Sequence, residues 1–484
     1  MSVSPPAWEG HKSFPDFPPV GFRGRVVRPS DHETYHHVRQ IWNARTGSSP
    51  ALIAQCRHAD DVLMAVEYCR DRKEAMAIRG GGHATDGHAM PRNAFVIDMS
   101  LMKRIQVDPT TGVTKIEAGV LLGEMDAATQ EHGFVVPSGT VSSTGAAGLT
   151  LGGGLGFLTR RFGMTVDHLL SVDVVTVDGR RLRASESENP DLFWGLCGAG
   201  HNLAIATSFT YQARRVGPRV MSGLVIYAVD DAVAVLTQLD QVLAAAPREL
   251  TICPVVLPVP ALPHLPKEMT GAAILALVVV YTGCLSAYPE AVAGLRSLAP
   301  QPLADTVSSS TWLATNSILD VLSLPGRRQQ SRGGYLAAIT PQVAQSAVAL
   351  VRAAPAPEDA ARPSVAIAFP CLGGAALDVD EDSMAFSREG AHWLWEVVGQ
   401  WDSQHEDEEY MIWVDDVMKS LNPLSLDNGY VNLSSDGGAP WLRRLYGSRE
   451  KWERLCALKN QFDPHNRLCY NKNIRRAADR ENKL

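Results

Sequence analysis

Apolar residues recur at helical spacing in some segments of this chain and in short β-branched runs in others. Residues 60–73 have apolar positions three and four apart, with acids at their start, and residues 121–134 show the same helical spacing up to Gly133. Between them, FVIDMS (95–100) and TKIEAGV (114–120) are typical of strands. Strands and helices are therefore expected to alternate through the first third of the chain.

Later segments continue both patterns. Residues 171–185 predict a β-hairpin, and residues 205–213 predict the strand that follows it. The apolar run AAILALVVVY (272–281) is far shorter than the ~20 residues that a membrane helix needs, and its β-branched content favours a buried strand. Residues 441–468 predict one amphipathic helix, stopped by Asp463-Pro464.

Length and composition limit the classes of protein to consider. A chain of 484 residues is too long for one core, so two domains, or one domain with a large insertion, are expected. A net charge of −7 offers no basic face for nucleic acid. The first 19 residues lack a basic stretch followed by an apolar one, so no secretory signal or membrane contact is expected, and the protein is predicted to be cytoplasmic. The eight scattered cysteines predict reduced thiols rather than disulfides.

Two glycine clusters are the strongest chemical signals. Residues 77–90, AIRGGGHATDGHAM, place three glycines before His83, with His88 five positions further on. A zinc site would need more ligands than these two histidines and Asp86, whereas a phosphate cradle would need the glycines but not the histidines. Residues 138–163 contain eight glycines among Ser and Thr hydroxyls. Since glycine lets backbone amides approach phosphate oxygens, two such loops suggest a ligand with a long polar centre, such as a dinucleotide.

Neither cluster fits a common nucleotide-binding motif. GxGxxG and GxxxxGK[ST] are both missing from the sequence, so the Rossmann and P-loop interpretations fail. GxSxG is missing as well. On composition alone, ordinary glycine-rich turns remain an alternative to a ligand site.

Longer stretches carry a family resemblance. RGGGHATDGH (79–88), PSGTVSSTGAAGLTLGGGLGFLTRRFGMTVDHL (137–169) and LFWGLCGAGHNLAIATSFTY (192–211) resemble the FAD-binding (PCMH-type) domain of the vanillyl-alcohol oxidase superfamily. The resemblance is to the branch typified by berberine bridge enzyme and gluco-oligosaccharide oxidase. GYVNL (429–433) and YGSREKWERLCALKNQFDPHNRL (446–468) resemble the C-terminal segment of that branch, with its Tyr-x-Asn motif. The combination is specific because the motifs span both ends of the chain in the right order.

The resemblance implies an α+β fold with two parts. One is a two-part FAD-binding domain of the vanillyl-alcohol oxidase type, expected over residues 1–216. The other is an α+β substrate-binding domain with an antiparallel sheet, expected over residues 217–426. A C-terminal segment, residues 427–484, is expected to return to the FAD-binding domain.

The resemblance also implies a covalent cofactor. In this family the histidine after the glycines is bonded through its ring to the 8-methyl carbon of the flavin, so His83 would carry FAD, and the preceding glycine amides would bind its diphosphate. No metal ligands are expected. The remaining FAD contacts implied by the motifs are Arg79, Gly80, Gly81, Gly82, Ala84, Thr85, Gly87, His88, Ser138, Gly139, Thr140, Thr144, Gly145, Gly148, Gly153, Gly154, Gly156, Ile205 and Asn432.

Some positions depart from the family pattern. Members with a second flavin bond have a cysteine where this chain has Val141, so the resemblance implies a single covalent bond. Cys197, His201 and Ala204 stand where the family usually has an arginine and two glycines, which leaves the contacts of that loop open. His88 is open between a flavin contact and a buried structural histidine.

Two residues are candidates for the catalytic base. By the resemblance, Tyr430 of the Tyr-x-Asn motif lies close to the flavin with Asn432 supporting it, and Glu396 matches the catalytic glutamate of berberine bridge enzyme. A phenol with a pKa near ~10 is a poor base unless a neighbour lowers its pKa, whereas burial beside Trp393 and Trp395 would raise the pKa of Glu396. Tyr430 is preferred because Tyr-x-Asn is the more specific signal. A core tyrosine and a solvated strand glutamate are the structural alternatives.

The expected function is FAD-dependent oxidation of a CH–OH or CH–N centre in a small organic metabolite, as in secondary metabolism, with O₂ as acceptor and H₂O₂ as product. A dehydrogenase with another electron acceptor and a non-catalytic flavin-binding protein are the alternatives. Few aromatic residues occur between residues 216 and 385, which favours a hydrophobic substrate over a sugar. The sequence does not identify the substrate.

Overall fold

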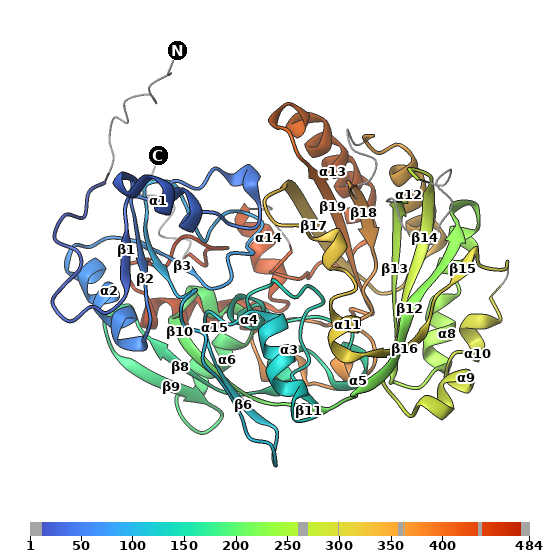
Figure 1. Cartoon of the computed structure of the whole chain (residues 1–484), viewed down its shortest axis with the longest axis horizontal. Helices are drawn as coiled ribbons and strands as arrows, with labels where there is room; N and C mark the ends of the chain where they lie inside the picture. Colours follow the sequence, from blue (N-terminus) through green and yellow to red (C-terminus); the bar gives the residue numbers. More distant parts are fainter. Residues whose placement is uncertain are drawn as a thin grey trace.

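The computed structural model describes residues 12–259, 270–298, 300–356, 362, 364–433 and 438–475 (Figure 1). Most of the proline-rich start and the end of the C-terminal tail lie outside these residues. Figure 1 shows the segments coloured blue to green on one side of the molecule and a large sheet with its helices on the other. The α+β class expected from the sequence is confirmed, and the exact domain boundaries stay a prediction.

A small sheet near the N-terminus positions the first glycine cluster. Its strand order is β1 (Arg25–Val27), β2 (Leu52–Gln55), β4 (Phe95–Asp98), β3 (Met76–Arg79). β2 and β3 run parallel to β4, and β1 runs antiparallel to β2. Helix α2 (Ala59–Asp71) corresponds to the helix expected over residues 60–73. Because β3 ends at Arg79, the glycines begin directly at the carboxyl edge of this sheet.

A second, antiparallel sheet completes this half of the molecule. Its strand order is β5 (Ile105–Val107), β6 (Val113–Glu117), β10 (Ile205–Gln212), β8 (Leu169–Val175), β9 (Arg181–Ser185). β8 and β9 form the expected hairpin. The helices that accompany this sheet are α3 (Leu122–Gln130), α4 (Ala146–Leu151), α5 (Thr159–Phe162) and α6 (Pro190–Ala199), with α1 (His32–Val38) near the first sheet. The second glycine cluster leads into α4 and continues to α5.

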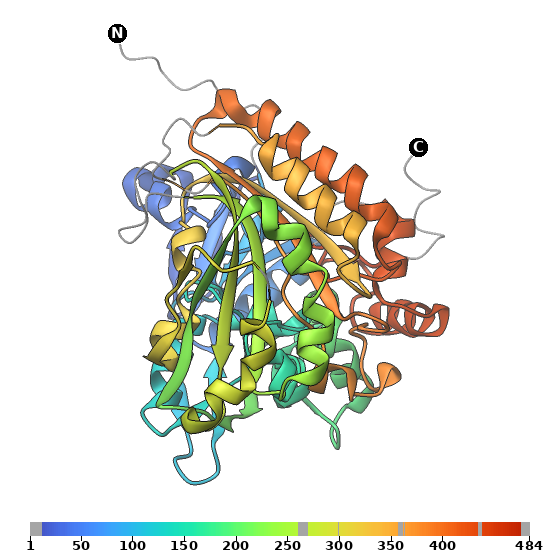
Figure 2. The same cartoon turned by 90° about the vertical axis from the view of Figure 1, so that its right-hand side faces the viewer.

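The third sheet has eight strands and is antiparallel throughout its described pairs, as the resemblance implied. The strand order is β15 (Ala304–Asp305), β12 (Arg219–Ala228), β14 (Ala273–Tyr281), β13 (Leu250–Pro258), β18 (Val365–Ala368), β19 (Trp393–Trp401), β17 (Arg328–Leu336), and β16 (Ser308–Thr311) pairs with β12. Helices α12 (Pro341–Arg352) and α13 (Asp407–Leu421) lie along one face (Figure 2). The short elements are β7 (Phe134–Val135), β11 (Arg214–Arg215), α7 (Ala232–Leu236), α8 (Leu239–Ala245), α9 (Tyr288–Ala291), α10 (Ala293–Arg296) and α11 (Trp312–Asn316).

The C-terminal segment forms two helices, so the prediction of one continuous helix over residues 441–468 was wrong. α14 (Gly438–Leu445) ends before Gly447, whose φ of +76° is left-handed and breaks the helix. α15 (Arg449–Phe462) then begins with Ser448 as its N-cap. Lys459 of α15 donates from Nζ to the Asn202 carbonyl at 3.0 Å, which holds this segment against the half of the molecule that carries the glycine clusters.

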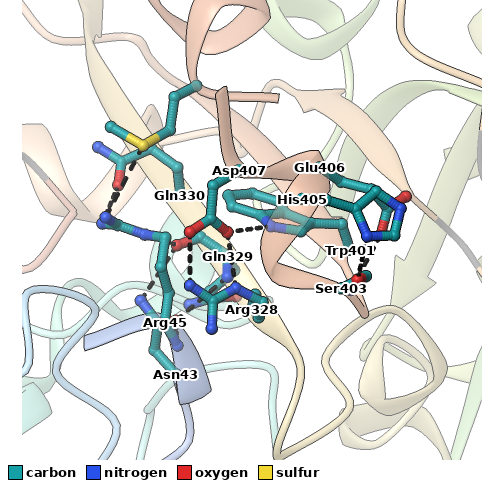
Figure 3. Close-up of polar contacts among 11 residues, drawn as sticks. Asn43, Arg45, Arg328, Gln329, Gln330, Trp401, Ser403, His405, Glu406 and Asp407 are labelled. Atoms are coloured by element: carbon teal, nitrogen blue, oxygen red, sulfur yellow. Dashed lines mark hydrogen bonds and ion pairs between the residues drawn. The ribbon is translucent and has the colours of Figure 1, made fainter. Parts of the chain in front are cut away.

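A polar cluster joins the N-terminal segment to the large sheet (Figure 3). Asn43 Nδ2 donates to the Gln329 carbonyl at 3.1 Å, and the Gln329 amide donates back to Asn43 Oδ1 at 3.1 Å. Arg45 Nε donates to the same carbonyl at 3.0 Å. Asn43 Nδ2 also donates to the Thr85 carbonyl at 2.7 Å, so this one amide links β17 to the loop that carries His83.

Candidate active site

A cavity of ≈ 400 Å³ lies where the two glycine clusters face the large antiparallel sheet. We call the lining residues of the ranges 80–85 and 139–148 the glycine-loop wall. The opposite side, the sheet wall, consists of Thr251, Cys253, Ser331, Ala368, Leu394 and Glu396. The Tyr-x-Asn motif and residues 470–472 of the C-terminal segment also line the cavity. Motifs far apart in the sequence thus meet around one space.

A second cavity of ≈ 120 Å³ adjoins the first. The two share six lining residues: Ile78, Gly80, Gly148, His201, Tyr470 and Asn471. The smaller cavity is mostly apolar and includes Met76, Met99, Ile205 and Leu468. Because the two spaces share lining residues, a ligand with a polar centre and an apolar end group could occupy both.

His83 is held firmly at the glycine-loop wall. Its ring stacks on the Trp42 ring, with 4.3 Å between centroids and 17° between planes. Its Nε2 lies 3.2 Å from Ser143 Oγ. Burial lowers the pKa of His83 to about 4, so the imidazole is neutral at neutral pH and keeps a nucleophilic lone pair.

The glycine loops can hold an anionic group such as the diphosphate of FAD. A Cβ added at Gly145 would lie 2.5 Å from the Gly81 nitrogen, so these backbones touch and need glycine. A Cβ at Gly148 would meet no atom within 4 Å, although Gly148 lines both cavities, and a side chain there would enter the site. Within the described residues, the amides of Gly81, Gly82 and His83 donate to no protein acceptor. Unpaired amides suit an anion.

Two hydroxyls next to these loops point to the same conclusion. Thr85 Oγ1 and Ser138 Oγ are buried without a hydrogen-bond partner among the described residues. Buried polar atoms are normally paired, by protein, water or ligand. Thr85 lines the main cavity, so a polar cofactor there would supply the missing partner of its hydroxyl.

The Tyr-x-Asn motif docks onto the second glycine cluster. Tyr430 Oη accepts hydrogen bonds from the Gly154 amide and from Asn432 Nδ2, both at 3.1 Å. Asn432 Nδ2 also donates to the Leu149 carbonyl at 3.0 Å. Burial raises the pKa of Tyr430 to about 12, with these hydrogen bonds opposing the rise. At neutral pH the phenol keeps its proton.

Glu396 reaches the cavity through the alternation of β19. Its neighbours Trp395 and Val397 point the other way, into the core beneath α13. Glu396 lies opposite Ala368 and Gly333 in the sheet register, and Ser331 Oγ donates to its Oε1 at 2.7 Å. Burial raises the pKa of Glu396 to about 7, against the hydrogen bond from Ser331. The carboxyl group is therefore poised to exchange a proton near neutral pH.

The structure brings most of the predicted site residues together. Those that line the main cavity are Gly80, Gly81, Gly82, His83, Ala84, Thr85, His88, Gly139, Thr140, Thr144, Gly145, Gly148, Gly156, Glu396, Tyr430 and Asn432. Ile205 lines the smaller cavity. Those outside both linings are Arg79, Gly87, Ser138, Gly153 and Gly154.

Two of the residues outside the lining have visible supporting contacts. Arg79 Nη1 donates to the Val38 carbonyl at 2.7 Å and pairs with Asp98, which fixes the start of the first loop. Gly154 has a φ of +83°, and its amide holds the Tyr430 hydroxyl. These two residues shape the site without facing the cavity.

Some residues that depart from the family pattern line the cavities, and others lie outside them. Val141 lines the main cavity, and His201 lines both cavities, with burial lowering its pKa to about 3. Cys197 is buried outside both linings. Cys253 and Cys371 line the cavity, and burial raises their pKa values to about 12 and about 11, so both are neutral thiols. All eight cysteines are free in the structure.

Several cavity residues could not be found from sequence. Trp42, which stacks on the His83 ring, belongs to no recognisable motif, and Ser143, which contacts His83 Nε2 from outside the cavity lining, lies within the second glycine cluster but was not singled out. Ser331 comes from β17 and is placed only by sheet register. Lys472 lines the cavity and pairs with Asp86 at 3.4 Å, and its burial lowers its pKa.

Two kinds of feature are missing from the part of the chain that the structure describes. No three or more His, Cys, Asp and Glu side chains there are grouped so that they could hold a metal ion. None of the described helices has both the length and the apolar character needed to cross a membrane.

Comparison with known proteins places an FAD binding domain in the first half of the chain. Residues 50–185 match the family described as FAD binding domain. The chain is 28% identical over 462 residues to the uncharacterized FAD-linked oxidoreductase YgaK of Bacillus subtilis (strain 168), covering 93% of this chain and 96% of that protein. It is 32% identical over 223 residues to (R)-6-hydroxynicotine oxidase of Paenarthrobacter nicotinovorans, covering 46% of this chain and 48% of that protein.

Solved structures extend the likeness to the whole fold. 6-Hydroxy-D-nicotine oxidase from Arthrobacter nicotinovorans superposes with a TM-score of 0.82 at 24% identity, covering 94% of this chain and 99% of that chain. Xylooligosaccharide oxidase from Myceliophthora thermophila C1 gives a TM-score of 0.80 at 22% identity, covering 94% and 97%. The FAD-binding domain and the fold expected from the sequence resemblance are confirmed.

Proposed function

We propose that this chain, which has the FAD binding domain and fold of the berberine bridge enzyme-like branch of the vanillyl-alcohol oxidase superfamily, is an oxidase with FAD bonded covalently to His83. Its substrate is a small organic molecule with a CH–OH or CH–N centre, and its electron acceptor is O₂, which is reduced to H₂O₂. The names of the nicotine oxidase and xylooligosaccharide oxidase relatives support oxidase chemistry.

One observation carries this proposal: a neutral, stacked His83 and the ionisable Glu396 line the same cavity from opposite walls. A flavin attached at His83 would extend between the glycine-loop wall and the sheet wall. Unpaired amides would hold its diphosphate, and the apolar cavity around Ile205 would receive its adenine. A substrate would then lie between the flavin and the sheet wall.

Bound FAD supplies the redox chemistry by accepting a hydride from the substrate carbon. The protein must position that C–H bond and accept the O–H or N–H proton. With a pKa of about 7, Glu396 is the better base near neutral pH, whereas Tyr430, with a pKa of about 12, is suited to donating a hydrogen bond. The pKa values therefore favour Glu396 as the catalytic base, whereas the Tyr-x-Asn motif favoured Tyr430.

Cys253 and Cys371 do not favour a second flavin bond. Both thiols are neutral, and the thiolate is the reactive form of cysteine. Val141 stands at the position where some family members have the second attachment. We therefore propose a single bond, through His83.

The proposal is tested by denaturing the purified protein and examining its flavin, and then by reducing the flavin with candidate substrates without oxygen. Flavin that stays with the chain in SDS and reoxidises rapidly in air with formation of H₂O₂ supports a covalent oxidase. Slow reoxidation in air would identify a dehydrogenase with another acceptor. A flavin that washes out, or that no substrate in a broad metabolite screen reduces, would contradict covalent attachment or catalysis, respectively.

A further inference from the structure

The sheet wall is chemically simple. Thr251 and Cys253 come from β13, Ala368 from β18 and Leu394 from β19, and all four are neutral. As defined, this wall has no Lys or Arg and no aromatic ring. Its polar atoms are two hydroxyls, one thiol and the carboxyl group of Glu396. Tyr430 and Cys371 line the same cavity and are neutral at neutral pH, so Glu396 is the one acidic group of the sheet wall.

Glu396 has no cationic partner among the described residues. Its hydrogen bond is from Ser331 Oγ at 2.7 Å, and burial is the main influence on its ionisation. A carboxylate desolvated without a counter-ion is unfavourable, and a cation placed beside it removes much of that cost. The protein does not provide this cation, but a ligand could.

We propose that the substrate is an apolar amine that binds as its ammonium ion, with the nitrogen paired to the Glu396 carboxylate and the carbon skeleton against the apolar sheet wall. This inference rests on the proposed function. It favours CH–N over CH–OH chemistry, since an alcohol would leave the carboxylate without a counter-ion. It also disfavours sugars, whose many hydroxyls would find few polar partners on this wall.

The proposed oxidation of the amine takes place in two steps. Glu396 takes one proton from the ammonium nitrogen and becomes a neutral carboxylic acid, which leaves a free amine. The α-carbon of the amine then loses hydrogen with its electron pair to FAD, and the C–N single bond becomes the C=N bond of an iminium ion. The amine is oxidised by two electrons and the cofactor is reduced by two.

The test compares two ligands of the same shape and different charge. The holoprotein is titrated anaerobically at pH 8 with N-methylbenzylamine and with benzyl methyl ether, in which oxygen replaces the N–H group, while the flavin absorbance is followed. Cellobiose serves as the sugar probe. At this pH most Glu396 is ionised and the amine is largely protonated. We expect the amine to bind at least about 10-fold more tightly than the ether, as for a charge-assisted hydrogen bond.

Two variants test whether the preference for the amine over the ether depends on Glu396. Glu396→Gln should remove the preference for the amine, because the neutral amide offers no counter-ion. Glu408→Gln, at an exposed position on α13 outside the cavity, should keep it. Equal binding of amine and ether by the wild-type protein, no response to the amine, or a preference that survives in Glu396→Gln would overturn the inference.

The outcomes also separate this inference from the proposed function. If benzyl alcohol or cellobiose reduces the flavin and the amine does not, the enzyme is an oxidoreductase and the amine inference fails. If the amine binds with the expected preference but no compound in the metabolite screen reduces the flavin, the amine site stands and the catalytic proposal fails.

Discussion

The two walls of the main cavity are built in opposite ways. The glycine-loop wall presents backbone, with Gly81 and Gly145 packed so closely that neither can carry a side chain. The sheet wall presents side chains, since β19 turns Glu396 and Leu394 toward the cavity and Trp395 into the core. The glycine-loop wall is fixed at Gly81 and Gly145 by contacts that tolerate no added atom, whereas the sheet wall can change its chemistry by substitution on a rigid strand. This difference suits a constant cofactor and a variable substrate.

The largest expected effect lies on the glycine-loop wall. His83→Ala removes the nucleophilic ring, so all covalently attached flavin should be lost. Flavin fluorescence of the denatured protein on an SDS gel measures this directly. His88→Ala removes another cavity-lining imidazole and should keep the attachment, so retention of fluorescence in His83→Ala, or its loss only in His88→Ala, would place the bond elsewhere.

Alanine at two nearby glycines should give different defects. Gly145→Ala forces its Cβ to within 2.5 Å of the Gly81 nitrogen, so we expect the apoprotein to lose about 1–3 kcal/mol of stability, as for an overpacked site. Gly148→Ala meets no atom within 4 Å and should leave apoprotein stability unchanged while reducing FAD loading. Denaturant unfolding and flavin content measure the two effects. Equal stability of both variants would show that the close approach of the loops is relaxed.

A smaller change is expected at the Tyr-x-Asn motif. Tyr430→Phe leaves the Gly154 amide without this acceptor, while Asn432 Nδ2 keeps the Leu149 carbonyl, so we expect about 10-fold slower flavin reduction, as from the loss of one hydrogen bond, with bound FAD retained. Anaerobic stopped-flow reduction gives the rate. A loss of 10²–10⁴-fold, the usual range for a general base, would restore Tyr430 to that role.

The mildest effect should come from the ring beneath His83. Trp42→Ala removes the stacked indole and should slow covalent attachment several-fold without preventing it, whereas Trp42→Phe keeps a stacking ring and should attach flavin nearly as fast as the wild type. The time course of flavin attachment to apoprotein supplied with FAD measures this. Trp452→Ala, on α15 outside both cavity linings, controls for general loss of an indole. Equal rates for both alanine variants and the wild type would mean that the ring does not position His83.

The glycine-loop wall could be predicted from the sequence because its residues are contiguous and their spacing is typical of the family's FAD-binding motifs. The sheet wall is different: Ser331, Ala368 and Glu396 meet only through the register of β17, β18 and β19. Glu396 was proposed by position in a family strand, and its Ser331 partner was missed. Trp42 was missed because it lies well outside the glycine motif and meets His83 only in the folded chain.

The C-terminal helices show a second limit. The apolar periodicity of residues 441–468 continues through Tyr446-Gly447, which is why one helix was expected. The structure ends α14 before this pair because Gly447 takes a left-handed conformation, and Ser448 caps a new helix. Apolar periodicity indicates which face of a helix is buried, whereas single residues such as Gly447 determine where the helix ends.

The central claim is that Glu396, on the sheet wall, is the base for a flavin held by the glycine-loop wall. The most direct measurement is the pH dependence of anaerobic flavin reduction by a saturating substrate, in the wild type and in Glu396→Gln. A base works in its ionised form, so the wild-type rate should rise with pH through about 7 and level off above it. Glu396→Gln should be about 10²–10⁴-fold slower and lack this rise. A Glu396→Gln variant that keeps the wild-type rate and the same pH dependence would contradict the account.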